Sequence, residues 1–311
     1  MTPILVFYSQ FDSFEEWQAL LAPLLPPNLR ICQEQDIDDP DQVLYALAWK
    51  PPQGFFARYR NLRLLVNLGA GVDSLVGRDD LPDIPITRLS DPNMGRMMAS
   101  YVLFAVLRYA RDIPAFERAQ RERRWHYLHP RLPETMRVGV LGLGELGAYA
   151  AAELVRQGFD VRGWSRSAKQ LDGVTCCSGM DSLDRFIASS DILVVMLPLT
   201  QETRGLLTAE RLALMPAGSC FINVSRGAVV DQQALTEALT SGRIAEATLD
   251  VFDREPLPPE DPLWGLDNVL ITPHLASVAI PDSAARQIAD NIERLERGET
   301  VLHQIDPARG Y

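Results

Sequence analysis

The chain of 311 residues is too long for one ordinary hydrophobic core, and its length predicts two domains. Its hydrophobic content of 47% is sufficient to fill both cores. The 30 basic and 41 acidic residues give a net charge of −11 without a long block of one sign, which argues against nucleic acid as a partner.

The first ninety or so residues alternate short apolar runs with helical stretches. Ile4–Tyr8, Tyr45–Trp49 and Leu64–Leu68 are predicted strands, and Phe14–Leu25 is a predicted helix that ends at Pro26-Pro27. This pattern is typical of a small open α/β unit. An apolar helix from about Met98 to Arg111 then leads into the central part of the chain.

The central part repeats strand and helix six times. The predicted strands are Val138–Leu141, Val161–Trp164, Ile192–Leu197, Cys220–Val224, Ala247–Val251 and Val269–Thr272. Parallel strands with helical crossovers form a doubly wound sheet. A last helix, about Asp282 to Arg297, is expected to return to the first domain and make it discontinuous. The predicted domains are therefore residues 1–97 with 279–311, and residues 98–278.

The most specific motif follows the first of these strands, at Gly142-Leu143-Gly144-Glu145-Leu146-Gly147. In this G-x-G-x-x-G pattern the first glycine permits a tight turn, the second lets the backbone approach a pyrophosphate, and the third lets helix and strand pack closely. The helix that follows would present free N–H groups and its positive dipole end to the phosphates. The stretch predicts a dinucleotide site with contacts from Gly142, Gly144, Glu145, Leu146 and Gly147.

The end of the next strand indicates which dinucleotide binds. An acid about 20 residues after the glycines would bond the ribose 2′-hydroxyl of NAD. Asp160 stands too early, and the strand end carries Ser165, Arg166 and Ser167 instead. A carboxylate repels a 2′-phosphate, whereas a guanidinium binds one through paired, charge-assisted hydrogen bonds. A solvated basic turn is the plainer alternative, but the missing acid and the arginine together favour NADPH, with NADH as a poorer substitute.

Three chemically active side chains follow successive strands, at the edge where ligands bind in an open parallel sheet. Arg226 follows the fourth strand, Glu255 the fifth and His274 the sixth. Reduction of a 2-oxo acid needs a cation for the carboxylate and carbonyl oxygens and a proton donor for the developing alkoxide. It also needs a carboxylate that keeps the donor protonated. Arginine, histidine and glutamate meet these needs, although each also has a plainer interpretation as a cap, a core histidine or a solvated loop acid.

Several classes of site are not indicated. The spacing of the four cysteines indicates neither a disulfide framework nor a zinc site; they are Cys32, Cys176, Cys177 and Cys220. We therefore expect no metal, and we expect the protein to function in a reducing cytoplasm. The N-terminal stretch does not resemble a signal peptide, and no apolar stretch is long enough to span a bilayer. The basic run from Arg118 to Arg124 is expected to coat a solvated helix end.

Seven motifs stand in a characteristic order along nearly the whole chain: Gly69-Ala70-Gly71-Val72-Asp73, the glycine turn, Ser165-Arg166-Ser167, Ser225-Arg226-Gly227, Glu255-Pro256-Leu257, Thr272-Pro273-His274 and the terminal Asp306-Pro307-Ala308-Arg309-Gly310-Tyr311. In this order they resemble the D-2-hydroxyacid dehydrogenase family, and within it the bacterial glyoxylate/hydroxypyruvate reductase A branch. The resemblance implies an NADPH-dependent oxidoreductase that reduces glyoxylate to glycolate and hydroxypyruvate to D-glycerate. It also implies a homodimer, with a Rossmann domain inserted in a smaller flavodoxin-like substrate domain.

The same resemblance implies roles for single residues. Arg226 would bind and polarise the oxo acid, His274 would give the proton, and Glu255 would hold His274 in its charged form. The N–H groups of Ala70 and Gly71 would hold the substrate carboxylate. Apart from the resemblance, Trp49 and Trp125 are candidates to close the pocket, although aromatic residues more often belong to a core. Asp250 would meet the nicotinamide carboxamide, and further cofactor contacts would come from Leu197, Pro198, Val224, Ser225 and His274.

Two other functions are compatible with the same fold. Some relatives are non-catalytic, NAD(P)(H)-sensing interaction proteins, and the retained Arg226, Glu255 and His274 distinguish this chain from them. Dehydrogenases of the formate or phosphite type would be expected to prefer NAD, so Arg166 counts against that function.

Overall fold

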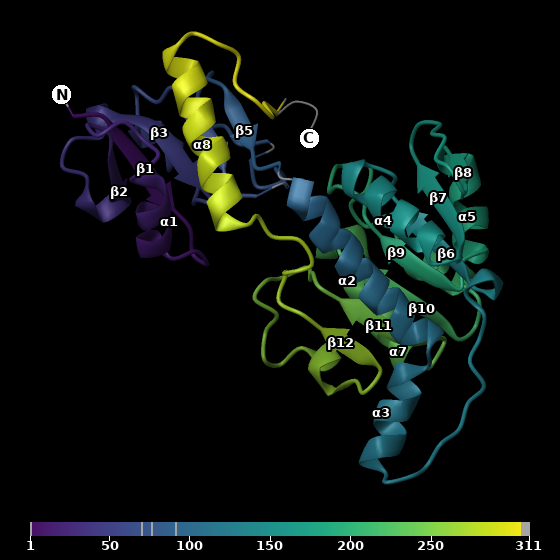
Figure 1. Ribbon diagram of the computed structural model, residues 1–311. Helices are drawn as coiled ribbons and strands as arrows, with labels where there is room; N and C mark the ends of the chain where they lie inside the picture. The colour runs from purple at the N-terminus through teal and green to yellow at the C-terminus, as the bar shows by residue number, and fades with distance from the viewer. Residues whose placement is uncertain (1, 70, 76, 91, 306–311) are drawn as a thin grey trace. The chain divides into compact units, whose positions relative to one another are not determined.

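The structure, a computed structural model, describes residues 2–69, 71–75, 77–90 and 92–305. Ala70 and the terminal motif Asp306–Tyr311, both named in the sequence analysis, lie outside the described residues. The chain separates into two compact units, residues 1–94 with 278–311 and residues 95–277 (Figure 1). The chain leaves the first unit and re-enters it, so that unit is discontinuous in sequence.

The first unit contains one parallel sheet with the strand order β2-β1-β3-β4-β5. Helices α1 (Phe14–Leu21) and α8 (Pro281–Glu296) pack together against one face, and Phe55 and Phe56 lie in the core of the other. This strand order is the flavodoxin-like arrangement that the resemblance implied. The strands are β1 (Ile4–Tyr8), β2 (Arg30–Gln33), β3 (Val43–Ala48), β4 (Leu64–Asn67) and β5 (Ile86–Arg88).

The second unit contains a parallel sheet of seven strands in the order β12-β11-β10-β9-β6-β7-β8. The strand order reverses between β6 and β9, as it does at the switch point of a doubly wound fold. The predicted fold class is confirmed. The strands are β6 (Arg137–Leu141), β7 (Asp160–Ser165), β8 (Val174–Ser178), β9 (Ile192–Val195), β10 (Ser219–Asn223), β11 (Ile244–Leu249) and β12 (Val269–Ile271).

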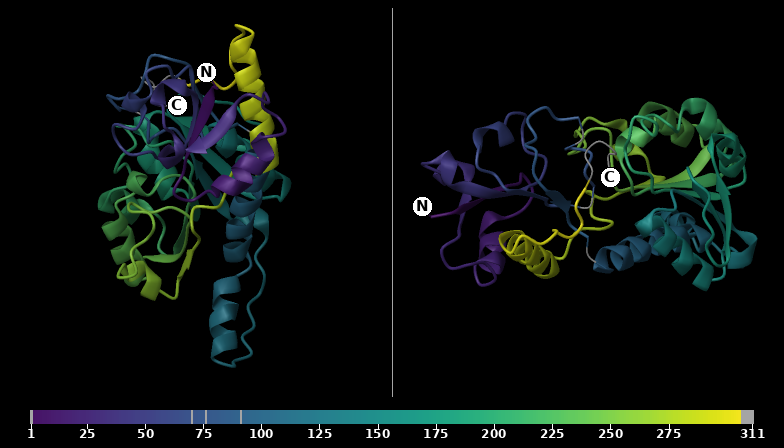
Figure 2. Two further views of the ribbon diagram at one scale, coloured as in Figure 1. Left: turned by 90° about the vertical axis from the view of Figure 1, so that its left-hand side faces the viewer. Right: turned by 90° about the horizontal axis from the view of Figure 1, so that it is seen from above.

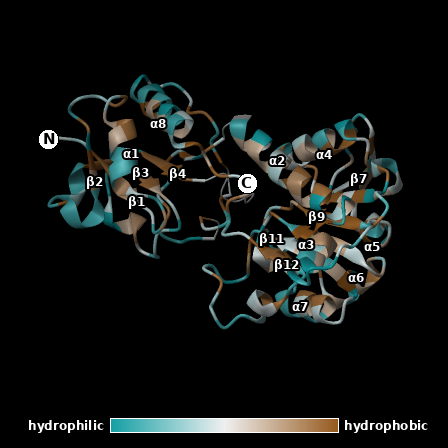
Figure 3. Ribbon diagram, turned by 60° about the horizontal axis from the view of Figure 1, so that its bottom comes forward, coloured by the Kyte–Doolittle hydropathy of each residue, from teal (hydrophilic) through white to brown (hydrophobic). Residues whose placement is uncertain are grey.

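Helices cover both faces of this larger sheet (Figure 1). On β9, Ile192 and Val194 belong to the core that α2 and α4 contribute to, and Leu193 and Val195 belong to the opposite core with α5, α6 and α7. Alternate strand residues point to opposite faces, so a strand covered on both sides is apolar throughout. Figure 3 shows this as hydrophobic strands beneath helices with hydrophilic outer faces. The helices are α2 (Pro92–Ala110), α4 (Glu145–Arg156), α5 (Met180–Ala188), α6 (Ala209–Leu214) and α7 (Gln232–Thr240).

Some predicted elements were wrong in number or length. The central sheet has a seventh strand, β8, which was missed because it is an edge strand with polar residues such as Thr175 and Ser178. In the first unit the short edge strands β2 and β5 were missed for the same reason. The helix predicted for Phe14–Leu25 ends at Leu21, whose carbonyl accepts from both Leu24 and Leu25 in a closing turn.

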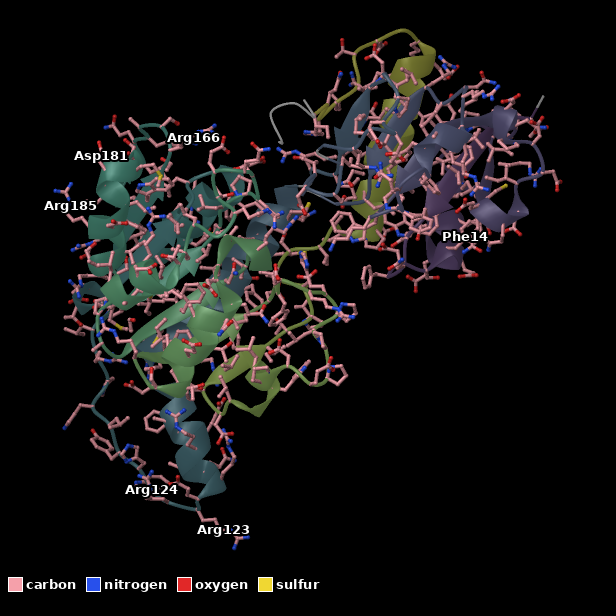
Figure 4. All side chains as sticks on the ribbon, turned by 180° about the vertical axis from the view of Figure 1, so that it is seen from behind. Phe14, Arg123, Arg124, Arg166, Asp181 and Arg185 are labelled. Carbon is pink, nitrogen blue, oxygen red and sulfur yellow. The ribbon has the colours of Figure 1, made fainter. Side chains whose placement is uncertain are left out.

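An arm projects from the sheet of the second unit. It consists of α3 (Ile113–Arg121) and the extended segment 122–132, which runs back beside the helix (Figure 2). The ring of His126 on the returning segment lies 6.5 Å from that of Phe116 on α3. Arg123 and Arg124 lie at the far tip (Figure 4), so the basic run does coat a solvated helix end.

Candidate active site

The predicted site residues of the second unit leave the sheet at one edge. Asn223 of β10 pairs with Leu249 of β11, and Leu249 pairs with Ile271 of β12. On the other side of β10, Asn223 pairs with Val195, which in turn pairs with Leu141 at the end of β6. Because the strands are parallel and in register, the glycine turn and the segments with Arg226, Asp250 and His274 all start at the carboxyl edge.

The glycine turn has the steric properties that its sequence predicts. Gly142 has a φ of +115°, and a Cβ there would lie 2.7 Å from the Met196 carbonyl oxygen. A Cβ on Gly147 would lie 1.8 Å from the Gly142 carbonyl oxygen, so only glycine allows α4 to pack this closely. Gly144 differs, because nothing lies within 4 Å of its added Cβ. Gly144 is also the N-cap of α4 and offers no side-chain cap, so the first N–H groups of the helix are available to a phosphate.

The end of β7 carries no acid beside this turn. Ser165 is buried, and its hydroxyl donates to the Ser167 carbonyl oxygen at 2.8 Å, which holds the basic turn in a compact form. Arg166 is exposed at the surface (Figure 4). The pKa of Glu202, in the segment after β9, is lowered mainly by a hydrogen bond with Thr200 and also by the charge of Arg166. Arg166 directly follows β7, whose Trp164 pairs with Leu141 at the end of β6, so it starts at the same carboxyl edge as the glycine turn.

His274 and Glu255 form a hydrogen-bonded pair. Nδ1 of His274 lies 2.9 Å from Oε2 of Glu255, and the two side chains are 30% and 18% exposed. The other carboxylate oxygen of Glu255 accepts from the Phe252 N–H at 3.1 Å, which fixes the carboxylate. The carboxylate accepts from Nδ1 and so sets which ring nitrogen carries the proton. Nε2 is then the nitrogen that can deliver a proton to a substrate.

Asp250 holds the segment that carries His274. Its carboxylate is buried and accepts from the Thr272 hydroxyl at 2.6 Å and from the N–H groups of Leu275 and Ala276, both at 2.9 Å. Its carbonyl oxygen accepts from the His274 N–H at 2.9 Å. Residues 272–276 therefore fold around Asp250. The predicted contact of Asp250 with a nicotinamide carboxamide stays a prediction.

The Arg226 turn is set by its neighbours. The buried Asn223 accepts from the N–H and hydroxyl of Ser225 and donates to the Arg226 carbonyl oxygen. A Cβ on Gly227 would lie 1.8 Å from the Phe252 carbonyl carbon, so the Arg226 turn lies directly on the backbone before Glu255. The guanidinium donates to the Ser225 carbonyl oxygen at 2.6 Å. Val224, Ser225 and Leu197 are buried, whereas Pro198 is exposed.

In the first unit, Trp49 and Asn67 both contact Gly69. Ala48 of β3 pairs with Asn67 of β4, and the Trp49 ring lies against Gly69, where a Cβ would come within 2.3 Å of it. The side-chain amide of Asn67 donates to the carbonyl oxygens of Gly69 and Gly71 at 2.9 and 2.8 Å. Trp125, the other aromatic candidate, lies on the arm of the second unit and is 97% exposed.

Sequence reasoning missed the residues that hold the site residues in place. Asn223, Asn67 and Thr272 each anchor a turn that the motifs identified, but none received a role. An Asn at a strand end that bonds the backbone two residues later is a known turn signal, and Asn223-Val224-Ser225 carries it. Thr272 gave no such signal, because its partner Asp250 lies on another strand.

Two further kinds of site were checked over the described residues. They include no group of three or more His, Cys, Asp or Glu side chains placed to hold a metal ion. They also include no helix with the length and apolar character needed to cross a membrane.

Comparisons with known proteins identify the family of this chain. The sequence model of the D-isomer specific 2-hydroxyacid dehydrogenase, NAD binding domain, matches residues 103–276. A glyoxylate/hydroxypyruvate reductase A from Serratia proteamaculans is 39% identical, with 99% of each chain covered. A D-isomer specific 2-hydroxyacid dehydrogenase from Xanthobacter autotrophicus, solved with NADPH and MES, is 63% identical with a TM-score of 0.92 over 100% of both chains. An NADPH-dependent glyoxylate/hydroxypyruvate reductase from Sinorhizobium meliloti, solved with NADP and sulfate, is 33% identical with a TM-score of 0.91 and covers 99% of this chain and 100% of its own.

Two glycine substitutions should separate cofactor binding from stability. Gly144→Ala places a methyl group in open space on a backbone with φ −67°, so the free energy of unfolding should change by less than about 0.5 kcal/mol. NADPH binding should weaken about tenfold or more, because the methyl group keeps the pyrophosphate from the backbone. Gly147→Ala should destabilise the protein by about 1–3 kcal/mol, because the new Cβ meets backbone.

Denaturant unfolding and NADPH fluorescence titration of both variants would check this prediction. Unchanged NADPH affinity in Gly144→Ala would contradict the role of the turn, as would an equal loss of stability in the two variants.

Proposed function

Because the chain belongs to the D-isomer specific 2-hydroxyacid dehydrogenase family, we propose that it is an NADPH-dependent reductase of small 2-oxo acids. The proposed substrates are glyoxylate and hydroxypyruvate, which would give glycolate and D-glycerate. The observation that carries the proposal is the His274–Glu255 pair, at 2.9 Å, on the sheet edge that also bears the glycine turn. An acid catalyst and a dinucleotide turn at one edge are the parts that carbonyl reduction requires.

The proposed mechanism assigns one task to each residue. NADPH, when bound, supplies the hydride to the carbonyl carbon. His274 gives its proton to the oxygen that becomes the alkoxide, and Glu255 keeps the imidazole charged until then. Arg226 binds the substrate and stabilises the negative charge on the carbonyl oxygen. The bonds from Asn223 and the contact of Gly227 with residue 252 hold the Arg226 turn in place, which limits reorganisation during the reaction.

We assign substrate binding to residues 1–97 with 279–311 and cofactor binding to residues 98–278. In the first of these, the proposed contacts are the N–H groups of Ala70 and Gly71 for the carboxylate, with Trp49 as a wall of the pocket. The support is that Asn67 ties down the carbonyl oxygens of Gly69 and Gly71, and that Trp49 lies against Gly69. The free cysteines support the cytoplasm as the proposed compartment. The non-catalytic alternative finds no support among the relatives.

We propose that a second copy of this chain covers the arm. Trp125, Tyr127 and Leu132 on the returning segment are 97%, 69% and 62% exposed, and Phe104 on α2 is 51% exposed. Aromatic side chains at this exposure mark protein interfaces, and arginine is enriched there too. The arm tip carries Arg123 and Arg124, whereas the chain as a whole has a net charge of −11, so a second copy offers complementary charge.

The first prediction concerns His274. In the wild-type protein, NADPH should be oxidised in the presence of glyoxylate and hydroxypyruvate, and more slowly with NADH in its place. His274→Asn should lower the turnover rate by roughly 10²–10⁴-fold, because the alkoxide loses its proton donor, while NADPH still binds.

His129→Asn is the matched control, because His129 lies on the exposed arm. The turnover rate of this variant should equal that of the wild type. Full activity in His274→Asn would end the proposed mechanism. Absence of NADPH oxidation with each of glyoxylate, hydroxypyruvate and pyruvate would end the proposed substrate class.

The second prediction concerns the choice of coenzyme. Arg166→Ala should weaken NADPH binding by roughly 2–3 kcal/mol and leave NADH binding largely unchanged, because the guanidinium pairs with the 2′-phosphate that NADH lacks. Fluorescence titration with each coenzyme measures both affinities. Arg156→Ala, at the opposite end of α4 from the glycine turn, should alter neither affinity. An equal loss for both coenzymes would show that Arg166 has a structural role instead.

The third prediction concerns the homodimer. Trp125→Ser should raise the dimer dissociation constant about 30-fold or more, as expected when a central aromatic is lost from an interface. Sedimentation velocity over a range of concentrations measures the constant. Trp264→Ser is the control, because Trp264 is a half-exposed tryptophan outside the arm. A wild-type protein that stays monomeric, or equal effects of both substitutions, would exclude the arm as the interface.

A further inference from the structure

Two hydroxyl groups connect helix α2 with the segment that carries His274. The Tyr101 hydroxyl lies 2.5 Å from Oγ1 of Thr272, and this Oγ1 lies 2.6 Å from Oδ1 of Asp250. Tyr101 belongs to α2, Thr272 directly follows β12, and the buried Asp250 directly follows β11. The three groups form a continuous chain from the helix to the carboxylate around which residues 272–276 fold.

The direction of this chain follows from its protons. Both oxygens of the Asp250 carboxylate accept backbone N–H groups, from Leu275 and Ala276, so the carboxylate is an acceptor throughout. The single proton of the Thr272 hydroxyl must then lie in its bond to Asp250. The Thr272 oxygen consequently accepts from Tyr101. Burial raises the pKa of Tyr101 to about 12, so this side chain remains a donor at neutral pH.

His274 depends on this support because its backbone is in the left-handed region. Its φ is +56°, a backbone angle that residues other than glycine rarely adopt. Its N–H donates to the Asp250 carbonyl oxygen, and the next two N–H groups donate to the Asp250 carboxylate. The 2.9 Å contact between His274 and Glu255 exists only while this conformation holds. A change at Thr272 acts directly on that conformation, since Thr272 opens the segment.

We propose that Tyr101 and Thr272 are positioning residues for the proton donor. They act through Asp250 on the backbone of His274, and so keep Nδ1 of the imidazole against Glu255. This inference rests on the proposed role of His274. It adds that helix α2 helps to hold the proton donor in position. The expected consequence is a slower chemical step with unchanged NADPH affinity.

Kinetics of Tyr101→Phe test the inference against a matched control. The single-turnover rate of NADPH oxidation with glyoxylate should fall about three- to tenfold, the effect of losing one hydroxyl hydrogen bond, while the dissociation constant of NADPH stays the same. Tyr109→Phe is the control. The Tyr109 hydroxyl, on the same helix, lies 2.5 Å from Oγ1 of Thr248 within β11, away from the His274 segment. The single-turnover rate of Tyr109→Phe should match that of the wild type. Equal slowing in Tyr101→Phe and Tyr109→Phe would overturn the inference.

A double substitution tests the route. Thr272→Val keeps the shape of the side chain and removes its hydroxyl, so it should slow the reaction at least as much as Tyr101→Phe. If Tyr101 acts through Thr272, then adding Tyr101→Phe to Thr272→Val should cause no further loss. Additive losses would show that Tyr101 acts by another route and would overturn the chain.

A spectroscopic readout separates this inference from the proposed function. Nitrogen-15 NMR of the neutral imidazole, assigned with His274→Asn, reports which ring nitrogen carries the proton. In the wild type it should be Nδ1, because Glu255 accepts from it. The share of this tautomer should fall in Tyr101→Phe and in Thr272→Val, and stay constant in Tyr109→Phe. An unaltered tautomer in the first two variants overturns the positioning role. An altered tautomer in a protein that does not reduce glyoxylate or hydroxypyruvate would support the positioning role and refute the proposed substrates.

Discussion

The candidate active site depends on one buried carboxylate. Asp250 is 1% exposed, and its charge is balanced by three hydrogen bonds from residues 272–276. A buried charge is costly unless it is fully bonded, so these donors are held firmly in place. The same bonds impose the left-handed backbone of His274 and bring its ring to Glu255. Stability and the placement of the proton donor therefore have a common origin in Asp250.

Close backbone contacts complete the arrangement. Gly227 lies directly on residue 252, Gly147 lies on the Gly142 carbonyl oxygen, and no larger residue fits at either position. These contacts fix the segments after β10 and β11 and the start of α4 at the carboxyl edge. Because the segments are fixed by backbone, their side chains and N–H groups are in place before any ligand binds. Such preorganisation is where enzymes gain most of their electrostatic advantage. Gly144 is the exception, since it has open space around it, and it is also the residue that a pyrophosphate must approach.

We propose a local cause for the preference for a phosphorylated coenzyme. The end of β7 presents Ser165 and Arg166 where an acid would select NAD, and the serine hydroxyl is turned inward to Ser167. Of these two side chains, only that of Arg166 is exposed. The relatives solved with NADPH or NADP share the fold of this chain over nearly its full length. We propose that these two residues at one strand end select the coenzyme, without any change in the sheet.

The sequence alone determined the fold class, the glycine turn, the missing acid and the three candidate catalytic residues, because these depend on local periodicity and on short motifs at strand ends. The central apolar strands such as β9 were predictable, because they are buried on both faces. The edge strands β2, β5 and β8 were not, since a strand with only one neighbour needs less apolar sequence. Only the tertiary structure showed that Asp250 binds residues 272–276, that Tyr101 reaches Thr272, and that Gly227 touches residue 252. Each of these contacts joins residues that are distant in sequence. The contacts of Asp250 and Gly227 exist because parallel strands in register bring their ends to the same edge, whereas Tyr101 comes from helix α2, which packs on the sheet.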